Sequence, residues 1–218
     1  LPEDHLPSPR ANARIEYTRR TVTLTGLSAG FAGGQLSASA STRPDGTLAI
    51  SGSGSATPAG ISRQIDIPVV QRLLASAQGT TRYSGSLNVR GERLDLRVDS
   101  DLAGWSIDAP APLAKTAAEP MPLRVELNGL GSERDSIAVT AGSALAVRLE
   151  RARGADRTVR IERGVIAVGE PAQLPARGLF GLVNLPRLDV DAGMPLLEGP
   201  ESAPAARGAG SSSAGGRA

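Results

Sequence analysis

Apolar and polar residues alternate at a period of two through most of this chain, from Val22 to Val190. The segments 94–98 (LDLRV) and 145–149 (LAVRL) show the pattern clearly. Because successive side chains of a β-strand point to opposite faces, each such segment has one apolar and one polar face. The alternation therefore predicts a β-sheet with a continuous apolar face.

The composition excludes several classes of function. Only 2% of the 218 residues are aromatic, so aliphatic side chains must supply most of the apolar surface. The formal net charge is +2, and the arginines alternate with acidic residues along the predicted strands, so we expect no nucleic-acid partner. Cysteine is absent, which excludes disulfides and thiolate metal sites.

The chain divides into three parts by composition. Residues 1–10 are Pro-rich and predicted to be an extended entry segment, residues 11–200 form the β region, and residues 201–218 have the Ala/Gly/Ser composition of a flexible linker. The sequence contains no signal peptide and no transmembrane run, and it does not begin with Met. We interpret it as a fragment of a longer polypeptide, so the missing targeting signals say nothing about its location.

Turn residues divide the β region into an antiparallel meander of roughly ten strands. The turn at 43–46 (RPDG) joins a hairpin of strands 35–42 and 47–55, because Pro presets φ and Gly accepts a positive φ. The small residues at 51–55 predict a tight bend or a sheet edge. The other strands are expected at 13–18, 21–27, 81–90, 92–101, 123–128, 135–140, 143–152, 157–163, 165–169 and 178–190, with a last element near Asp191.

One short helix is predicted at 67–77. Asp66 is placed to cap it, Pro68 fits its first turn, and Gly79 follows its end. Its apolar positions share one face, namely Ile67, Val70, Leu73 and Leu74. A helix this short would close one end of a sheet.

The residues that could carry chemistry are few. The pairs Asp99/Asp101 and Asp189/Asp191 could hold calcium or act as an acid–base pair, but no Asp-rich loop surrounds either pair and a solvated strand face is the favoured explanation. His5 is the only histidine and lies in a terminal segment, which makes a poor rigid base. We therefore expect no enzyme, no catalytic residue, no metal and no cofactor.

Two further residues admit alternative roles. Lys115 is the only lysine and lies in a predicted crossing loop, where nothing suggests the desolvation that a Schiff-base lysine needs. Trp105 follows the strand at 92–101. It could anchor the protein to lipid or to a partner, or it could be a lid over the core.

Four segments resemble motifs of one known family. Residues 108–125 (DAPAPLAKTAAEPMPLRV) are similar to its "LPAPLxKxAxExLPLRV" stretch, and 83–104 is similar to its "W-x-G-x-L…L-x-V-x-S-x-L-x-G" hairpin, with Tyr83 where Trp is common. The pair 31–34 (FAGG) and 44–46 (PDG) resembles its "F-x-G-G…D-G" pair, and 188–192 (LDVDA) resembles its "L-D-L-D-x-W" segment without the Trp. These motifs identify a resemblance, over about residues 13–195, to the YhdP-type proteins of the bacterial AsmA-like family.

The resemblance implies a location and a function. YhdP-type proteins are very long periplasmic proteins anchored in the inner membrane by an N-terminal helix, which is not in this sequence. Their repeated β segments form an elongated trough with an apolar interior, implicated in moving phospholipids between the inner and outer membranes. The implied partners are phospholipid acyl chains, the membrane through the anchor, and neighbouring β repeats of the same longer chain.

We therefore expect a mainly β protein: an elongated, curved antiparallel meander that forms an open trough, with one short α-helix near 67–77 and a disordered C-terminal tail. The alternative is a closed β-sandwich acting as a structural or adhesion-type module, because a sandwich also needs one apolar face per sheet. The residues expected to line a lipid groove are Leu87, Val89, Leu94, Leu96, Val98, Leu123, Val125, Leu127, Val139, Leu145, Val147, Leu149, Val159 and Ile161.

Overall fold

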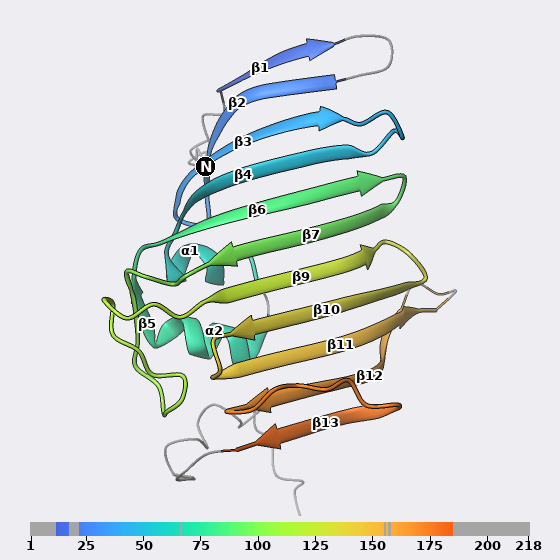
Figure 1. Ribbon diagram of the computed structural model, residues 1–218. Helices are drawn as coiled ribbons and strands as arrows, with labels where there is room; N and C mark the ends of the chain where they lie inside the picture. The colour runs from blue at the N-terminus through green and yellow to red at the C-terminus, as the bar shows by residue number, and fades with distance from the viewer. Residues whose placement is uncertain (1–11, 18–21, 66, 155, 157, 185–218) are drawn as a thin grey trace, which may run out of the picture.

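A single large β-sheet dominates the structure, a computed structural model that describes residues 12–17, 22–65, 67–154, 156 and 158–184. Eleven strands follow one another in the order β1-β2-β3-β4-β6-β7-β9-β10-β11-β12-β13 (Figure 1). They are β1 (Asn12–Tyr17), β2 (Val22–Phe31), β3 (Gly34–Thr42), β4 (Leu48–Ala56), β6 (Thr81–Arg90), β7 (Arg93–Ser100), β9 (Leu123–Leu130), β10 (Arg134–Ala141), β11 (Leu145–Arg153), β12 (Val159–Val168) and β13 (Gly178–Val183). The prediction of a mainly β protein with one open, mostly antiparallel sheet is confirmed.

The entry segment 1–10, the linker 201–218 and the last element near Asp191 lie outside the described residues. Residues 185–190 of the predicted strand 178–190 also lie outside the described residues. The first part of that predicted strand is β13.

The final strand departs from the predicted meander. β13 pairs with β12 in parallel, so the chain must cross over the sheet between them. The crossover lies on the face that carries Arg163, whose Nη1 donates a hydrogen bond to the Pro175 carbonyl (3.4 Å). On this face Val165 and Ala167 are 1% and 0% exposed. The crossover segment, which includes two prolines, therefore covers apolar residues that an antiparallel hairpin would leave open.

Two glycines were misread as interruptions. The predicted strands 157–163 and 165–169 are the single strand β12, and a Cβ at Gly164 would lie 2.4 Å from Leu149 Cδ2. Similarly, β4 lies inside the sheet between β3 and β6 and is neither a bend nor an edge. A Cβ at Gly54 would lie 2.9 Å from the hydroxyl oxygen of Tyr83. Both glycines make room for a side chain from the next strand.

Two short helices are present where the sequence predicted one. α2 (Pro68–Ala75) confirms the predicted helix, with Pro68 in its first turn. Its N-cap is Ile67, which makes no side-chain hydrogen bond, and Asp66, the predicted cap, lies outside the described residues. α1 (Pro58–Ser62) was missed, although Thr57 Oγ1 accepts a hydrogen bond from the Gly60 N–H (3.1 Å) and Pro58 begins the helix.

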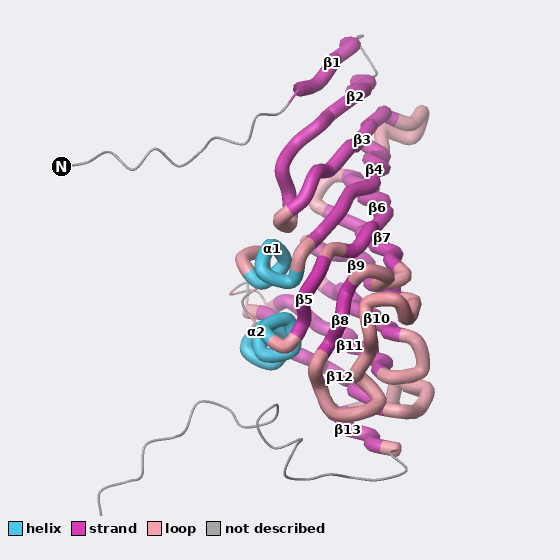
Figure 2. Tube along the Cα trace, turned by 90° about the vertical axis from the view of Figure 1, so that its left-hand side faces the viewer, coloured by secondary structure: helices cyan, strands magenta, loops and turns pink. Residues whose placement is uncertain are grey.

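The helices form a compact unit with a two-stranded sheet of β5 (Ala77–Gly79) and β8 (Trp105–Ile107), and we call these four elements the cap. Figure 2 shows both helices on the same side of the large sheet. The buried core of the cap contains Leu74, Ala77, Leu102, Trp105 and Ile107. Leu123, at the start of β9, packs against this core and joins the cap to the sheet.

Candidate functional site: an apolar sheet face

One face of the large sheet is apolar from strand to strand. Residues paired across neighbouring strands point to the same face, so the register identifies its members. Starting from Leu87, one row of paired residues runs Leu24, Ala40, Ile50, Leu87, Leu96, Leu127, Ile137, Leu149, Gly164 and Leu179. The next row runs Leu27, Ala38, Gly52, Gly85, Val98, Val125, Val139, Val147, Ile166 and Gly181. We call this surface the apolar face.

The register places every residue predicted to line a groove on the apolar face. The candidates in the first row are Leu87, Leu96, Leu127 and Leu149, and those in the second row are Val98, Val125, Val139 and Val147. The remaining candidates on β6 to β11 lie two residues from a row member on the same strand, namely Val89, Leu94, Leu123 and Leu145. On β12, Val159 and Ile161 pair with Arg153 and Arg151, which continue the same face of β11. That these residues contact lipid stays a prediction.

None of the predicted lining residues is buried. Most are half-buried, and Val159 and Ile161 are 43% and 50% exposed. The buried apolar residues instead belong to the cap, to strand ends or to the region under the crossover. Within the described residues the cap packs at the strand ends that carry Ala32, Ala56 and Leu123, and no second large sheet packs against the face. The closed sandwich is therefore not the arrangement of this part of the chain.

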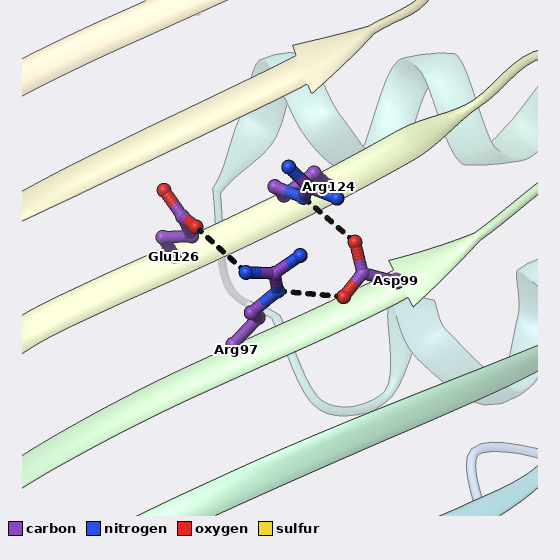
Figure 3. Close-up of polar contacts among 4 residues, drawn as sticks. All are labelled: Arg97, Asp99, Arg124 and Glu126. Atoms are coloured by element: carbon purple, nitrogen blue, oxygen red, sulfur yellow. Dashed lines mark hydrogen bonds and ion pairs between the residues drawn. The ribbon is translucent and has the colours of Figure 1, made fainter.

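The opposite face is polar, and its character changes along the sheet. On β3, β4 and β6 it carries serines, such as Ser39 and Ser51, whose hydroxyls are 3.3 Å apart. On β7 and β9 it carries charges (Figure 3). Asp99 accepts hydrogen bonds from Arg97 Nε (2.8 Å) and Arg124 Nε (2.7 Å), and these two bonds lower the pKa of the carboxyl.

Two shallow depressions are found on the polar face. One, of about 760 Å³, is lined by residues that include Asp99, Arg124 and Thr140, and the other, of about 410 Å³, by residues that include Ser39 and Ser51. The charged groups of the first already satisfy one another, and they are solvent-exposed. We therefore regard the apolar face, which has no such internal partners, as the candidate site.

The apolar face ends in charged residues at the side away from the cap. Asp135 and Arg151 face each other across β10 and β11, with Arg151 Nε 2.6 Å from Asp135 Oδ1. The Asp135 side chain is 4% exposed. Arg153 follows two residues later on the same face, and its Nε is buried without a hydrogen-bond partner among the described residues. The sequence analysis missed these residues, although Arg151 and Arg153 stand in phase with Leu145, Val147 and Leu149.

Trp105 is a lid over the cap core. Its side chain is buried, and its Nε1 donates a hydrogen bond to the Ala56 carbonyl (3.1 Å). Of the two roles that the sequence allowed, the structure supports the core lid.

Lys115 is buried, although nothing in the sequence suggested desolvation at this position. Its ammonium donates hydrogen bonds to the carbonyls of Leu102, Trp105 and Thr116. An ammonium group has three donors and no lone pair, and all three donors point here at carbonyl oxygens, so this arrangement offers no nucleophile. The lysine instead cross-links the loop segments that frame the cap.

The paired acids do not converge on an ion. Asp99 is held between two arginines, whereas Asp101 Oδ1 accepts a hydrogen bond from the Ala103 N–H (3.0 Å). Among the described residues, no three His, Asp or Glu side chains are grouped as metal ligands would be. His5 and the pair Asp189/Asp191 lie outside the described residues.

No helix in the described part of the chain is both long and apolar enough to cross a bilayer. In comparisons with known proteins, the family model described as "YhdP protein" matches residues 6–215. No curated protein and no solved structure matches the chain.

Proposed function

The chain belongs to the YhdP family, and on that premise we propose that its apolar face binds phospholipid acyl chains. In this proposal the chain is a segment of a periplasmic protein, anchored in the inner membrane by a part outside this sequence. The longer protein carries phospholipids between the inner and outer membranes without catalysing a reaction. Neighbouring β repeats of the same longer chain would continue the face.

The uncovered apolar face is the observation that carries this proposal. Proteins rarely leave contiguous apolar patches larger than a few hundred Å² exposed unless a ligand or partner covers them. Here the apolar rows cross ten strands, and none of the predicted lining residues is fully buried. The central rows contain only aliphatic residues and glycine, so they offer no directional contacts. Acyl chains suit such a surface because they need none.

The rest of the chain supports a role in binding without chemistry. The YhdP family is not a known enzyme family. The Lys115 side chain donates hydrogen bonds to backbone carbonyls, and the Asp99 carboxylate accepts hydrogen bonds from two arginines. These groups stabilise the protein and leave the apolar face as its distinctive surface.

Photo-crosslinking in the full-length protein, extracted natively, tests the proposal directly. Crosslinkers at Leu96 and Val147 on the apolar face should yield phospholipid adducts by mass spectrometry, whereas a crosslinker at Ser86 on the polar face should yield none. Absence of adducts from both apolar positions, together with absence of co-purifying phospholipid, would contradict lipid binding.

A matched pair of substitutions on β6 tests which face matters. Leu87→Asp places a carboxylate on the apolar face, whereas Ser86→Asp places the same group one residue away, opposite Arg97. An unpaired charge in an acyl-chain layer is costly. We therefore expect Leu87→Asp to abolish lipid loading and Ser86→Asp to preserve it, with both variants folded by circular dichroism. Equal lipid content in the two variants would show that the apolar face is not the binding surface.

Asp95, the polar neighbour of Leu96, is unsuitable as such a control. Its Oδ1 accepts a hydrogen bond from the Gly129 N–H (2.7 Å), at the register shift between β7 and β9, and Arg93 Nε also contacts it. Replacing Asp95 would therefore disturb the strand pairing as well as the surface charge.

A further inference from the structure

We propose that Arg153 binds the phosphate of a phospholipid whose acyl chains lie along β11, with the headgroup at the Arg153 margin and the chain ends toward the cap. This inference rests on the proposed function, because it assigns an orientation to a lipid on the apolar face.

Arg153 lies at the margin of the apolar face and forms no ion pair with another described residue. Its backbone N–H donates to the Glu133 carbonyl (2.7 Å), which fixes the strand end. Its side-chain Nε is buried and makes no hydrogen bond within the described residues. A buried donor without an acceptor is rare and costs free energy, so its presence needs an explanation. A ligand acceptor would supply one.

The nearby carboxylate of Asp135 already has an ion-pair partner. Asp135 pairs with Arg151 at 2.6 Å and is almost fully covered. This part of the apolar face therefore carries two guanidinium groups and one carboxylate, a net charge of one positive unit. A phosphodiester carries one negative charge, and its oxygens match the planar fork of donors that arginine presents.

The distance along β11 fits a lipid. A strand rises about 3.3 Å per residue, so Leu145 and Arg151 are about 20 Å apart and Leu145 and Arg153 about 26 Å apart. One leaflet of a bilayer has a hydrocarbon thickness of about 15 Å, half of the whole core. An acyl chain that begins near Leu145 and runs over Val147 and Leu149 would therefore end, with its glycerol, close to the arginines.

The two ends of the face differ in a way that sets the orientation. Leu145 pairs with Ala141, which pairs with Leu123, and Leu123 contacts the core of the cap. That end is apolar. The only other partnerless buried side-chain polar atom among the described residues is the Tyr83 hydroxyl, and burial raises its pKa, so it stays neutral. The free positive charge is at the Arg153 end.

The test compares lipids with and without a phosphate on the full-length protein. The probes are phosphatidylglycerol and diacylglycerol with identical labelled acyl chains, together with inorganic phosphate alone. The variants are Arg153→Gln, Arg153→Lys, and Arg160→Gln as a control. Arg160 is exposed and pairs with Ala152, so it lies on the polar face of the neighbouring strand. The control removes the same charge a short distance away.

We expect Arg153→Gln to weaken phosphatidylglycerol binding about tenfold, the effect of losing one charge-assisted hydrogen bond. Diacylglycerol binding should be unchanged, Arg153→Lys should restore part of the loss, and Arg160→Gln should behave as the wild type. Inorganic phosphate alone should bind far more weakly than phosphatidylglycerol, because it lacks the acyl chains.

Three outcomes would overturn the assignment. Equal binding of both lipids by the wild type, with no effect of Arg153→Gln, would mean that the face holds acyl chains without reading a headgroup, and the proposed function would survive. Tight binding of inorganic phosphate alone would mean a free-anion site. Failure of the wild type to bind either lipid would instead contradict the proposed function itself, and the orientation with it.

Discussion

The cap and the apolar face use the same aliphatic residue types in opposite ways. In the cap, Leu74 and Ile107 are buried around Trp105, and the buried Lys115 is satisfied by three carbonyls. On the apolar face, Leu96 and Leu127 pair with each other across β7 and β9, lie outside the cap core and are only partly buried among the described residues. The same residue types therefore form a closed core in the cap and an open surface on the sheet.

This contrast indicates that the open face is not simply an incomplete core. A sheet whose apolar side is only an incomplete core should lack a closed core nearby, but among the described residues the cap forms one at the strand ends that carry Ala56 and Leu123 and leaves the central rows uncovered. On β4 the apolar face carries Gly52 and Gly54, which have no side chain. Leu36 therefore lies close to Gly52, and Tyr83 lies close to Gly54. The difference between the two regions leads to four predictions, which begin with the largest effect.

Trp105→Ala should produce the largest loss of stability. It removes the central side chain of the cap core and leaves the Ala56 carbonyl without its hydrogen bond. Large-to-small changes of this kind in a closed core cost about 3–5 kcal/mol. Because Trp105 is the only tryptophan, urea unfolding should be followed by circular dichroism. Trp105→Phe, which retains most of the packing, should lose less. A cost below about 1 kcal/mol for Trp105→Ala would mean that the cap is not a closed core.

Leu127→Ala should cost less, although leucine-to-alanine changes in closed cores cost about 2–5 kcal/mol. Leu127 lies between Leu96 and Ile137 at the centre of the apolar face, and no other layer of the described residues covers it. We expect a loss of about 1–2 kcal/mol in lipid-free protein, because the side chain is only partly buried in the folded state. Urea unfolding provides the measurement. A cost above about 3 kcal/mol would indicate that another layer covers the face.

Much of this architecture could be predicted from sequence because period-two alternation determines which residues share a face. The positions of β6, β7 and β9 to β11, and the face of every predicted lining residue, followed from the pattern alone. The turn at 43–46 also marked its hairpin correctly, with the Gly46 N–H donating to the Arg43 carbonyl (3.0 Å). These features depend on neighbours in sequence.

Most of the misses depend on contacts distant in sequence, whereas the missed helix α1 is marked by local signals, the Thr57 cap and Pro58. Lys115 is buried because the loop around it folds onto Leu102 and Trp105. Gly164 is part of a strand because Leu149 occupies its space, and β13 is parallel because the crossover packs on Val165. Arg153 could have been noticed by extending the alternation one step past Arg151. What the sequence did not reveal is that Asp135 would pair with one arginine and leave the other free.

Acid should weaken the sheet modestly, through its polar face and not through the cap. Hydrogen bonds from Arg97 and then Arg124 lower the pKa of Asp99 below 3.8, and the Arg93 side chain followed by the Gly129 N–H lowers that of Asp95. A carboxyl whose pKa is lower in the folded state stabilises the protein above the unfolded pKa, and this contribution is lost as the pH falls through the folded value. Stability should therefore decline below about pH 4.

Urea midpoints measured from about pH 6 to pH 3 would show this decline. Because Asp99 is solvent-exposed, the effect should be smaller than that of Leu127→Ala. Asp99→Asn should flatten part of the decline, whereas Asp101→Asn, which removes a carboxyl outside the network, should not. Identical acid profiles for Asp99→Asn and the wild type would show that the ion network contributes nothing to stability.

The smallest effect on stability is expected at Arg153, on the apolar face. Arg153→Met removes a buried donor that has no acceptor and replaces it with an apolar chain among Val159 and its neighbours. We therefore expect the free energy of unfolding of lipid-free protein to change by no more than about 0.5 kcal/mol, or to rise. Arg151→Met is the contrasting variant, because it would leave the covered Asp135 carboxylate unpaired and should be strongly destabilising. A large loss for Arg153→Met would assign this arginine to the fold. A neutral result with impaired phospholipid binding would show that Arg153 is kept for a ligand, at the margin of a face that the chain leaves open.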